Sequence, residues 1–275
     1  MRRHGEVESS GGLGLHAHGC WTYGDDAEFR AGVFDFLVDG LELGQRLLYV
    51  GPGGVAKLRR DIDDIPGVES LLADGTMRIM PLETAYAVGT PIDPIAQLTM
   101  YAAATETALA DGFAGLRVAA DVTPLVTNPA LWEAHLRWEG VADRYAARHP
   151  LAGLCCFDRR QLPDEIVADL GCVHRATHGA AALAPFRLFA GREGLSLAGQ
   201  VDCFCADDLR RLLRLASPQE GPLVLELDEL DFIDHHGVFA IADHAEELTR
   251  SGRWMSVRGA PPSFDRLVEL LRVEL

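Results

Sequence analysis

The sequence predicts an α/β protein made of two consecutive domains, each with a sheet and covering helices. Short apolar runs typical of buried strands alternate with longer segments whose apolar residues recur at helical spacing. In the N-terminal part this alternation indicates a parallel sheet flanked by helices. The pattern restarts after Pro185, which indicates a second, smaller sheet with helices of its own. The length of 275 residues suits two domains.

The N-terminal part opens with an amphipathic helix from Phe29 to Leu41, which Asp25 or Asp26 caps and Gly44 ends. Predicted strands follow at Arg46–Val50, Met77–Met80, Leu116–Ala120 and Leu151–Phe157. Further predicted helices lie at Lys57–Asp64, Val68–Leu72, Asp93–Asp111, Leu131–Arg148 and Pro163–Leu170.

The apolar pattern of the C-terminal part predicts the element order β-β-α-β-α-β-α. Phe186–Ala190 and Leu195–Leu197 form a hairpin around a glycine turn. Later strands are predicted at Pro222–Leu227 and Trp254–Val257. Apolar stripes predict helices around Leu209–Ala216, Val238–Leu248 and Phe264–Leu271.

These patterns divide the chain into four parts. Residues 1–14 are polar and glycine-rich, and we expect a disordered leader there. Residues 15–178 form the first domain, residues 179–185 a linker, and residues 186–275 the second domain.

Charge and composition exclude several classes of function. The formal net charge is −16 and both domains are acidic, so neither offers the cationic face that nucleic acid or an anionic membrane requires. The first ten residues lack the apolar core of a secretory signal, so we expect a cytoplasmic protein. The six cysteines include no C-x-x-C pair, which favours reduced, buried thiols.

The clearest signature lies in the C-terminal domain. Residues 223–237 read LVLELDELDFIDHHG, a buried strand that runs into an acidic loop and then into a helix capped by Asp234. Residues 197–202 read LAGQVD. Together with the element order, these segments resemble the STAS domain of bacterial anti-sigma-factor antagonists. The resemblance implies a role in signal transduction and transcription regulation, with an anti-sigma factor or a histidine-kinase-like protein as partner.

The chain departs from the STAS pattern at the regulatory position. In that family a Ser or Thr just before the glycine is phosphorylated, whereas here His236 occupies that position and His235 precedes it. Because an imidazole has no hydroxyl, we expect no phosphoester at this helix start. The candidate partner-binding residues are Asp231, Asp234, His235, His236, Gly237 and Val238.

The N-terminal domain carries a second resemblance. Residues 15–26 read LHAHGCWTYGDD, residues 44–54 read GQRLLYVGPGG, residues 115–122 read GLRVAADV, and residues 154–160 read LCCFDRR. In this order they resemble the MEDS domain, a DcmR-like bacterial sensory module, over residues 15–178. The resemblance implies a RecA-like parallel sheet and a role as the input module of a regulator that responds to a small-molecule ligand.

A glycine loop offers an alternative function. Residues 51–58 read GPGGVAKL and overlay the phosphate-binding pattern G-x-x-x-x-G-K-[ST], but Ala56 and Leu58 replace the second glycine and the hydroxyl. The alternative is therefore a nucleotide-binding protein or ATPase. Its candidate ligand-binding residues are Gly51, Gly53, Gly54, Lys57 and Asp121.

A metal or thiol sensor is a further alternative. The candidate sensor residues His16, His18 and Cys20 alternate, which on a strand places them on one face. Cys172, His174 and His178 form a second group, and zinc could take four ligands only if the fold joins the two groups. Nothing in the sequence joins them, so we predict neither a metal nor a cofactor.

Our leading prediction is a non-enzymatic signalling regulator. No nucleophile motif such as G-x-S-x-G and no H-E-x-x-H zinc motif occurs, and we predict no catalytic residue. The N-terminal domain would sense a small ligand or a partner and shift the C-terminal docking surface between exposed and masked states.

Overall fold

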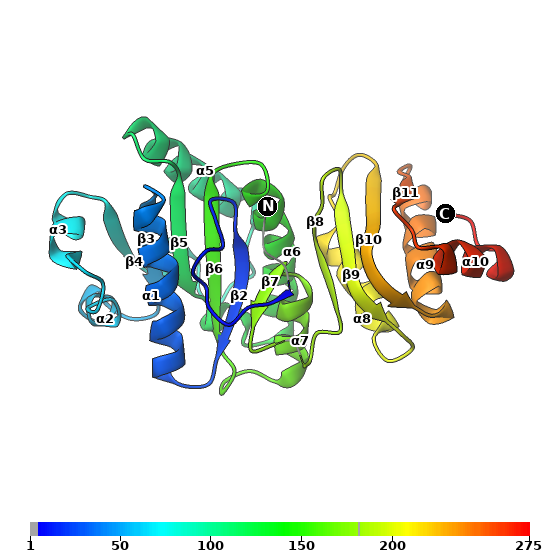
Figure 1. Ribbon diagram of the computed structural model, residues 1–275, viewed down its shortest axis with the longest axis horizontal. Helices are drawn as coiled ribbons and strands as arrows, with labels where there is room; N and C mark the ends of the chain where they lie inside the picture. Colours follow the sequence, from blue (N-terminus) through cyan, green and yellow to red (C-terminus); the bar gives the residue numbers. More distant parts are fainter. Residues whose placement is uncertain (1–4, 181) are drawn as a thin grey trace.

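The computed structural model describes residues 5–180 and 182–275, and over these residues the chain forms two sheets that lie side by side (Figure 1). The N-terminal sheet has seven strands and is parallel throughout. The C-terminal sheet has four strands. The predicted α/β class with two sheets is confirmed.

The N-terminal sheet has the strand order β1-β7-β2-β6-β5-β3-β4. Its central strands are buried over their whole length, which explains why they read as unbroken apolar runs. The strands are β1 (Gly5–Glu6), β2 (His18–Tyr23), β3 (Arg46–Gly51), β4 (Met77–Pro81), β5 (Leu116–Asp121), β6 (Leu151–Asp158) and β7 (Ala176–His178).

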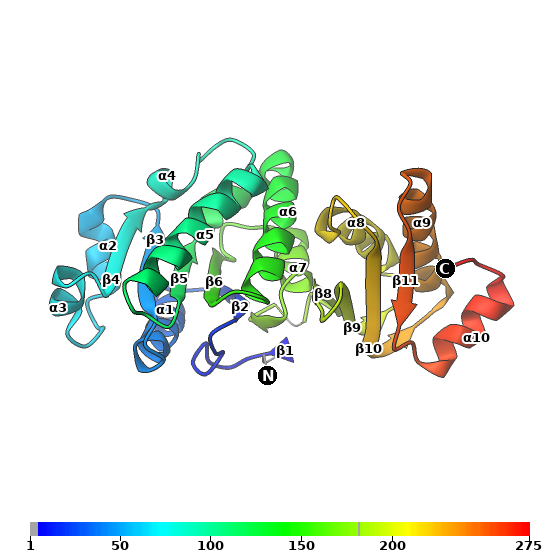
Figure 2. The same cartoon turned by 90° about the horizontal axis from the view of Figure 1, so that it is seen from above.

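Helices cover both faces of this sheet, as Figure 2 shows. Side chains of α5, α6 and α7 pack on one face, and those of α1 and α2 pack on the other. The helices are α1 (Asp26–Glu42), α2 (Val55–Asp61), α3 (Val68–Ala73), α4 (Leu82–Ala85), α5 (Pro94–Ala110), the 3-10 turn η1 (Thr123–Val126), α6 (Pro129–Ala146) and α7 (Asp164–Cys172).

The C-terminal sheet has the order β11-β10-β9-β8, with β8 and β9 antiparallel and the other pairs parallel. The predicted element order is confirmed. The elements are β8 (Phe186–Ala190), β9 (Leu195–Val201), α8 (Ala206–Ala216), β10 (Leu223–Ile233), α9 (His235–Arg250), β11 (Met255–Arg258) and α10 (Pro262–Leu271).

The two domains share one apolar core, and α6 is the element that joins them. One cluster of buried apolar side chains runs from the N-terminal sheet through α6 and α7 into the C-terminal sheet. Gly140 of α6 faces the backbone of Ala216 in α8, where a Cβ atom would approach the Ala216 Cα to 3.1 Å. The Arg144 guanidinium donates to the carbonyl of Ala216 at 2.5 Å.

An ion pair reinforces the contact between the domains. Arg211 of α8 donates to both carboxylate oxygens of Asp169 in α7, at 2.6 and 2.7 Å. The same guanidinium lies 5.2 Å from the ring of Trp132 in α6. Among the described residues, no helix is both long and apolar enough to cross a bilayer.

The prediction of a disordered leader is wrong for the part that the structure describes. Gly5 and Glu6 pair with β7, and Ser10 and Leu13 are buried. The Ser10 hydroxyl donates to the carbonyl of Gly32 at 2.6 Å. A short edge strand needs no apolar pattern of its own because the neighbouring strand supplies its hydrogen bonds. Residues 1–4 lie outside the described residues.

Two other boundaries differ from expectation. Ala180 and Ala184 of the predicted linker are buried, because Gly171 in α7 leaves room for both methyl groups. Strand β10 does not end in an acidic loop at residue 228 but continues to Ile233. Register shifts against β9 bend this extension, and Asp228 and Asp231 point to solvent.

Candidate functional site

A cluster of ionisable side chains is buried between the N-terminal sheet and α6. Glu139 of α6 is fully buried. Its Oε2 atom lies 3.0 Å from Nε2 of His18 in β2 and 3.3 Å from Nε2 of His174, just after α7. Its Oε1 atom lies 2.6 Å from Nε2 of His135. The Cys155 thiol of β6 lies 3.6 Å from Oε2, so one carboxylate meets three imidazoles and a thiol.

Two of the imidazoles are oriented by their other ring nitrogen. Nδ1 of His174 lies 2.7 Å from the carbonyl oxygen of Leu170, so this nitrogen carries the proton. Nδ1 of His18 lies 3.5 Å from Oδ1 of Asp143. Both rings therefore present Nε2 to Glu139.

Carboxylates dominate the electrostatics of this cluster. Burial disfavours the imidazolium form of His18, but Asp143 and Glu139 outweigh it and raise the pKa of His18 to about 9. Burial opposes ionisation of Glu139, yet the neighbouring imidazoles of His174 and His135 lower its pKa. Burial raises the pKa of the Cys155 thiol.

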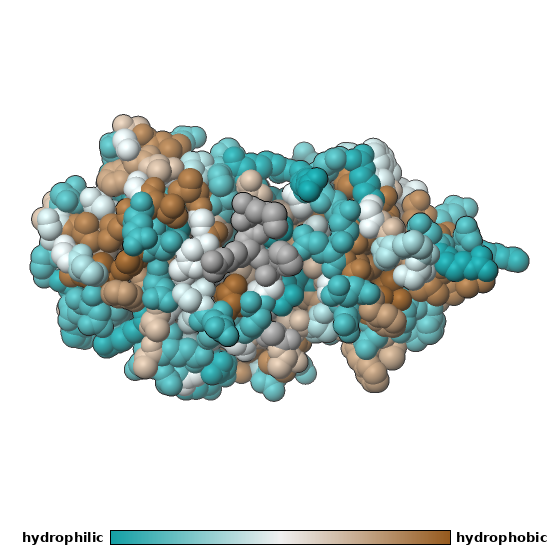
Figure 3. Space-filling view, viewed as in Figure 1, coloured by the Kyte–Doolittle hydropathy of each residue, from teal (hydrophilic) through white to brown (hydrophobic). Residues whose placement is uncertain are grey.

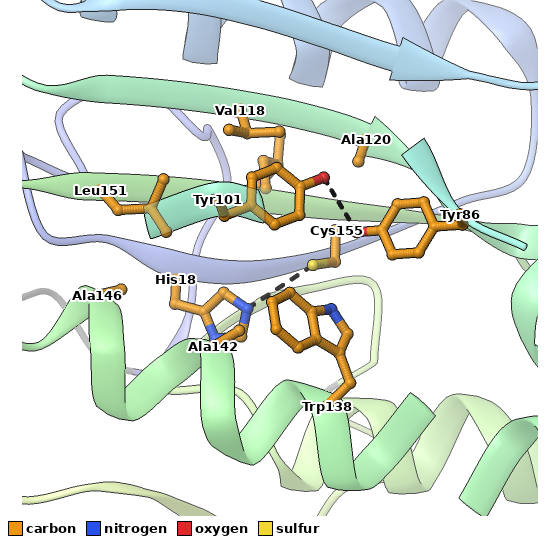
Figure 4. Close-up of a pocket in the computed structure, with 12 residues that line it drawn as sticks. His18, Tyr86, Tyr101, Val118, Ala120, Trp138, Ala142, Ala146, Leu151 and Cys155 are labelled. Atoms are coloured by element: carbon orange, nitrogen blue, oxygen red, sulfur yellow. Dashed lines mark hydrogen bonds between the residues drawn. The ribbon is translucent and has the colours of Figure 1, made fainter. Parts of the chain in front are cut away.

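A small cavity of about 40 Å³ lies beside the cluster (Figure 4). Tyr86, Tyr101 and Trp138 line it together with His18 and Cys155. The two tyrosine hydroxyls lie 3.0 Å apart, and the Trp138 ring stacks on Tyr101 at 5.9 Å. Since roughly 10–15 Å³ of such space holds one water, the cavity fits only a few non-hydrogen atoms.

The structure brings together only part of the predicted sensor set. His18 and His174 meet at Glu139, although they come from different predicted groups. The prediction that His16 shares a strand face with His18 is wrong, because β2 begins at His18. The His16 ring instead contacts backbone carbonyl oxygens at the end of α6, and Cys20 is buried in the core beside the cluster.

The remaining residues of the second group lie apart from the cluster. The Cys172 thiol is buried at the end of α7. The His178 ring stacks on Trp21 at 3.7 Å and contacts Glu28 at 3.0 Å.

The sequence reasoning missed Glu139, His135 and Cys155. A signal for the first two was present, because His135, Glu139 and Asp143 recur every four residues on one helix face. Polar residues at this spacing on the buried face of a helix indicate a site or a network.

The glycine loop follows β3, whose last residue Gly51 lies at the same sheet edge as Asp121, the last residue of the adjacent strand β5. Gly53 has a φ of 98°, and Gly54 precedes the seven-residue helix α2. The Lys57 ammonium donates to Asp61 at 2.6 Å. The Asp121 carboxylate accepts from Thr123 at 2.9 Å, and burial raises its pKa.

The other member of the loop set, Gly51, is the last residue of β3 and is buried. In the described part of the chain, therefore, the Lys57 charge already has a partner.

The candidate partner-binding residues lie at the start of α9. The Asp234 carboxylate caps this helix by accepting from the backbone N–H of His236 and of Gly237. His235 and His236 are exposed, with ring centroids 3.9 Å apart. Asp231 is exposed, whereas Gly237 and Val238 are buried.

Gly237 is required for packing, since a Cβ atom there would lie 2.6 Å from Ile233 and 2.7 Å from Val201.

Three exposed phenylalanines lie in the segments that meet at this helix start: Phe204 follows Cys203, whose thiol lies within 4.8 Å of ligand atoms of Asp234 and His236, and Phe232 and Phe239 flank the helix start along the chain. Phe204 is 90% exposed, Phe232 51% and Phe239 38%. Phe239 meets the His235 ring edge-on. Apolar residues gather on this lower side of the C-terminal domain in Figure 3. We call Phe204, Phe232, His235, His236 and Phe239 the aromatic surface; its phenylalanines were not predicted from the sequence.

Comparison with known families gives two matches, one in each part of the chain. A family model described as MEDS, the MEthanogen/methylotroph, DcmR Sensory domain, matches residues 17–175. A model of the STAS domain matches residues 194–274. No curated protein matches the chain significantly. The first match covers five of the seven strands, β2 to β6, together with the buried cluster, and the second covers three of the four strands, β9 to β11.

Proposed function

This chain belongs to the MEDS sensory family and continues into a STAS domain, and we propose that its N-terminal domain senses a small ligand and thereby controls protein binding by its C-terminal domain. Both domains are regulatory families, so the protein is a signalling regulator.

The cavity beside the cluster is the proposed ligand site. Its walls are mainly apolar, and the lining residues with polar side-chain groups are Tyr86, Tyr101, His18, Cys155 and Trp138. A site of this kind suits a compact, mostly apolar molecule with one polar group. Its volume of about 40 Å³ is too small for a nucleotide.

The proposed coupling between the ligand site and the C-terminal domain rests on the contacts of Asp143 in α6. Its Oδ1 atom lies 3.5 Å from the His18 ring, which lines the cavity. Its Oδ2 atom accepts from the backbone N–H of Ala190 in β8 at 2.5 Å. One buried carboxylate therefore touches both the sensor site and the C-terminal sheet. A ligand that moves His18 would change this contact and, through β8, the C-terminal sheet.

The aromatic surface is the proposed output. Exposed phenylalanines around a helix start provide anchors for a protein partner. As the STAS family implies, we propose that the partner is an anti-sigma factor or a histidine-kinase-like protein. Because His235 and His236 carry no hydroxyl, the ligand rather than phosphorylation would control this surface.

Titration calorimetry of the full-length protein with anti-sigma factors of the kinase-like class tests whether the aromatic surface binds such a partner. We expect Phe232→Ser to weaken binding by about 30-fold, the loss typical of an interface hot spot. Leu270→Ser on α10 is the matched control, because Leu270 is 63% exposed in the same domain but outside the aromatic surface. The proposal fails if no such factor binds, or if both variants bind like the wild type.

A further inference from the structure

We propose that His18, Glu139, Cys155 and His174 bind one divalent transition-metal ion, and that zinc fits the four donors best. Each residue offers one ligand atom, and these four atoms lie within 4.8 Å of one another. The donors come from β2, α6, β6 and the segment after α7, so only the folded chain assembles them. This inference does not depend on the proposed ligand or partner.

Four of the six donor separations match a tetrahedral site, and the other two, from His174 Nε2 to His18 Nε2 and to Cys155 Sγ, are within 4.8 Å. Zinc bonds of about 2.0–2.1 Å to nitrogen or oxygen and about 2.3 Å to sulfur imply donor separations of about 3.3 Å and about 3.6 Å. Oε2 of Glu139 lies 3.0 Å from His18 Nε2 and 3.3 Å from His174 Nε2. Sγ of Cys155 lies 3.6 Å from Glu139 Oε2 and 3.7 Å from His18 Nε2. Figure 4 shows the His18 ring and the Cys155 thiol directed at each other.

The chemistry of the donors selects the class of metal. Two imidazoles, one carboxylate and one thiolate suit zinc, whereas magnesium and calcium prefer sites made only of oxygen. The ligand forms are the thiolate of cysteine and the neutral imidazole of histidine, so metal binding releases the Cys155 proton and the proton that His18 carries at Nε2 to the buffer.

The residues around the donors form the outer shell that metal sites need. Nδ1 of His174 donates to the Leu170 carbonyl at 2.7 Å, and Nδ1 of His18 faces Asp143. Oε1 of Glu139 faces His135 Nε2 at 2.6 Å. The Leu170 hydrogen bond fixes the His174 ring with Nε2 directed inward. The His18–Asp143 and Glu139–His135 contacts lack hydrogen-bond geometry and only place polar groups beside the other two ligands.

An unpartnered buried atom points independently to a missing cation. The His174 ring is fully buried, and within residues 5–180 and 182–275 its Nε2 atom has no hydrogen-bond partner. It lies 3.3 Å from Glu139 without hydrogen-bond geometry. An unsatisfied buried nitrogen costs free energy, and a metal between the imidazoles and the carboxylate removes that cost.

Metal titration of the full-length protein tests the site. After treatment with a chelator, we expect the wild type to bind one Zn²⁺ per chain. With Co²⁺ we expect the visible spectrum of a tetrahedral ion together with a thiolate charge-transfer band. Cys155→Ala should lose that band and bind Zn²⁺ at least about 10-fold more weakly.

Two variants serve as matched controls. Cys156 is adjacent in β6 but packs on the opposite face of the sheet, and Cys203 lies in an exposed group with Asp234 and His236. Cys156→Ala and Cys203→Ala should both keep the band and the affinity.

The site is rejected if the wild type binds no stoichiometric Zn²⁺, or if the band survives in Cys155→Ala. The wild-type titration decides the matter even if the Cys155 variant fails to fold. Because it does not measure partner binding, a negative result leaves the proposed signalling function standing.

Discussion

Single buried side chains in this protein depend on contacts from distant parts of the chain. The Arg117 side chain is fully buried in β5 and donates to the Phe36 carbonyl at 2.6 Å and to Gln45 at 2.9 Å. It also pairs with Asp39 at 2.6 Å and lies 3.9 Å above the Phe36 ring. Gly40 leaves the space, since a Cβ atom there would lie 2.3 Å from Arg117 Cδ.

Removal of this arginine should destabilise the fold. Arg117→Met leaves the partly buried Asp39 carboxylate without its cation, and we expect the free energy of unfolding to fall by about 3–5 kcal/mol. Arg137→Met is the control, because Arg137 pairs with Glu133 at the surface and such pairs contribute about 1 kcal/mol or less. Urea denaturation measures both. Equal losses would contradict a special role for Arg117.

His244 gives a second prediction at this scale. Its ring is buried in α9, 3.0 Å from the Ser217 hydroxyl, and burial lowers its pKa below the ordinary value of 6.5. The unfolded chain therefore takes up a proton at a higher pH than the folded chain. Stability is complete above about pH 6.5 and is lost as the pH falls through the folded pKa.

Urea denaturation of the wild type and of His244→Gln at about pH 8 and about pH 5.5 measures this effect. We expect the wild type to lose more stability between the two pH values than the variant does. Parallel losses in the two proteins would show that His244 does not contribute.

At the scale of elements, helix α6 has two roles. One face carries His135, Glu139 and Asp143 into the buried cluster. The neighbouring face packs on α8 through Gly140 and Arg144. A helix that contacts both the sensor site and the output domain can transmit a displacement of about an ångström, because packed interfaces shift between discrete arrangements.

Asp143→Ala tests the connection that α6 makes. The substitution leaves the buried N–H of Ala190 without its acceptor, so we expect a loss of about 1–3 kcal/mol in the free energy of unfolding. We also expect faster hydrogen exchange in β8. Glu133→Ala on the exposed face of the same helix should change the free energy of unfolding by no more than about 0.5 kcal/mol and should leave hydrogen exchange in β8 unchanged. Unchanged exchange in β8 would contradict the role of Asp143.

At the scale of the whole molecule, the shared core makes the two domains mutually dependent. Buried residues of β8 and α8 pack against α6 and α7 in one apolar cluster. Separation would expose this apolar surface to water. The C-terminal domain therefore has its own sheet but shares its apolar core with the N-terminal domain.

We expect the full-length protein to unfold in one cooperative thermal transition, and a fragment of residues 186–275 to melt at a lower temperature or to aggregate. Differential scanning calorimetry of both proteins measures this. Two well-separated transitions in the full-length protein, with the fragment matching one of them, would show independent domains.

The sequence alone determined four of the seven N-terminal strands, the longer helices, the element order of the C-terminal domain and the two families. Buried parallel strands read as apolar runs, as at Leu116–Ala120, and local motifs such as the Asp234 cap act within a few residues. His18 and His174 could be singled out as candidates for the same reason, since their residue types are visible in the chain.

Only the tertiary structure decided which candidates meet. Strands that are neighbours in a parallel sheet can be far apart in the sequence, because a crossover connects each strand to the next. His18 of β2, Cys155 of β6 and Glu139 of α6 meet in this way, although His18 and Cys155 are more than a hundred residues apart. Strand order also decided that Gly5 and Glu6 pair with β7 at the sheet edge. Such contacts depend on the arrangement of elements in space, which periodicity along one chain does not encode.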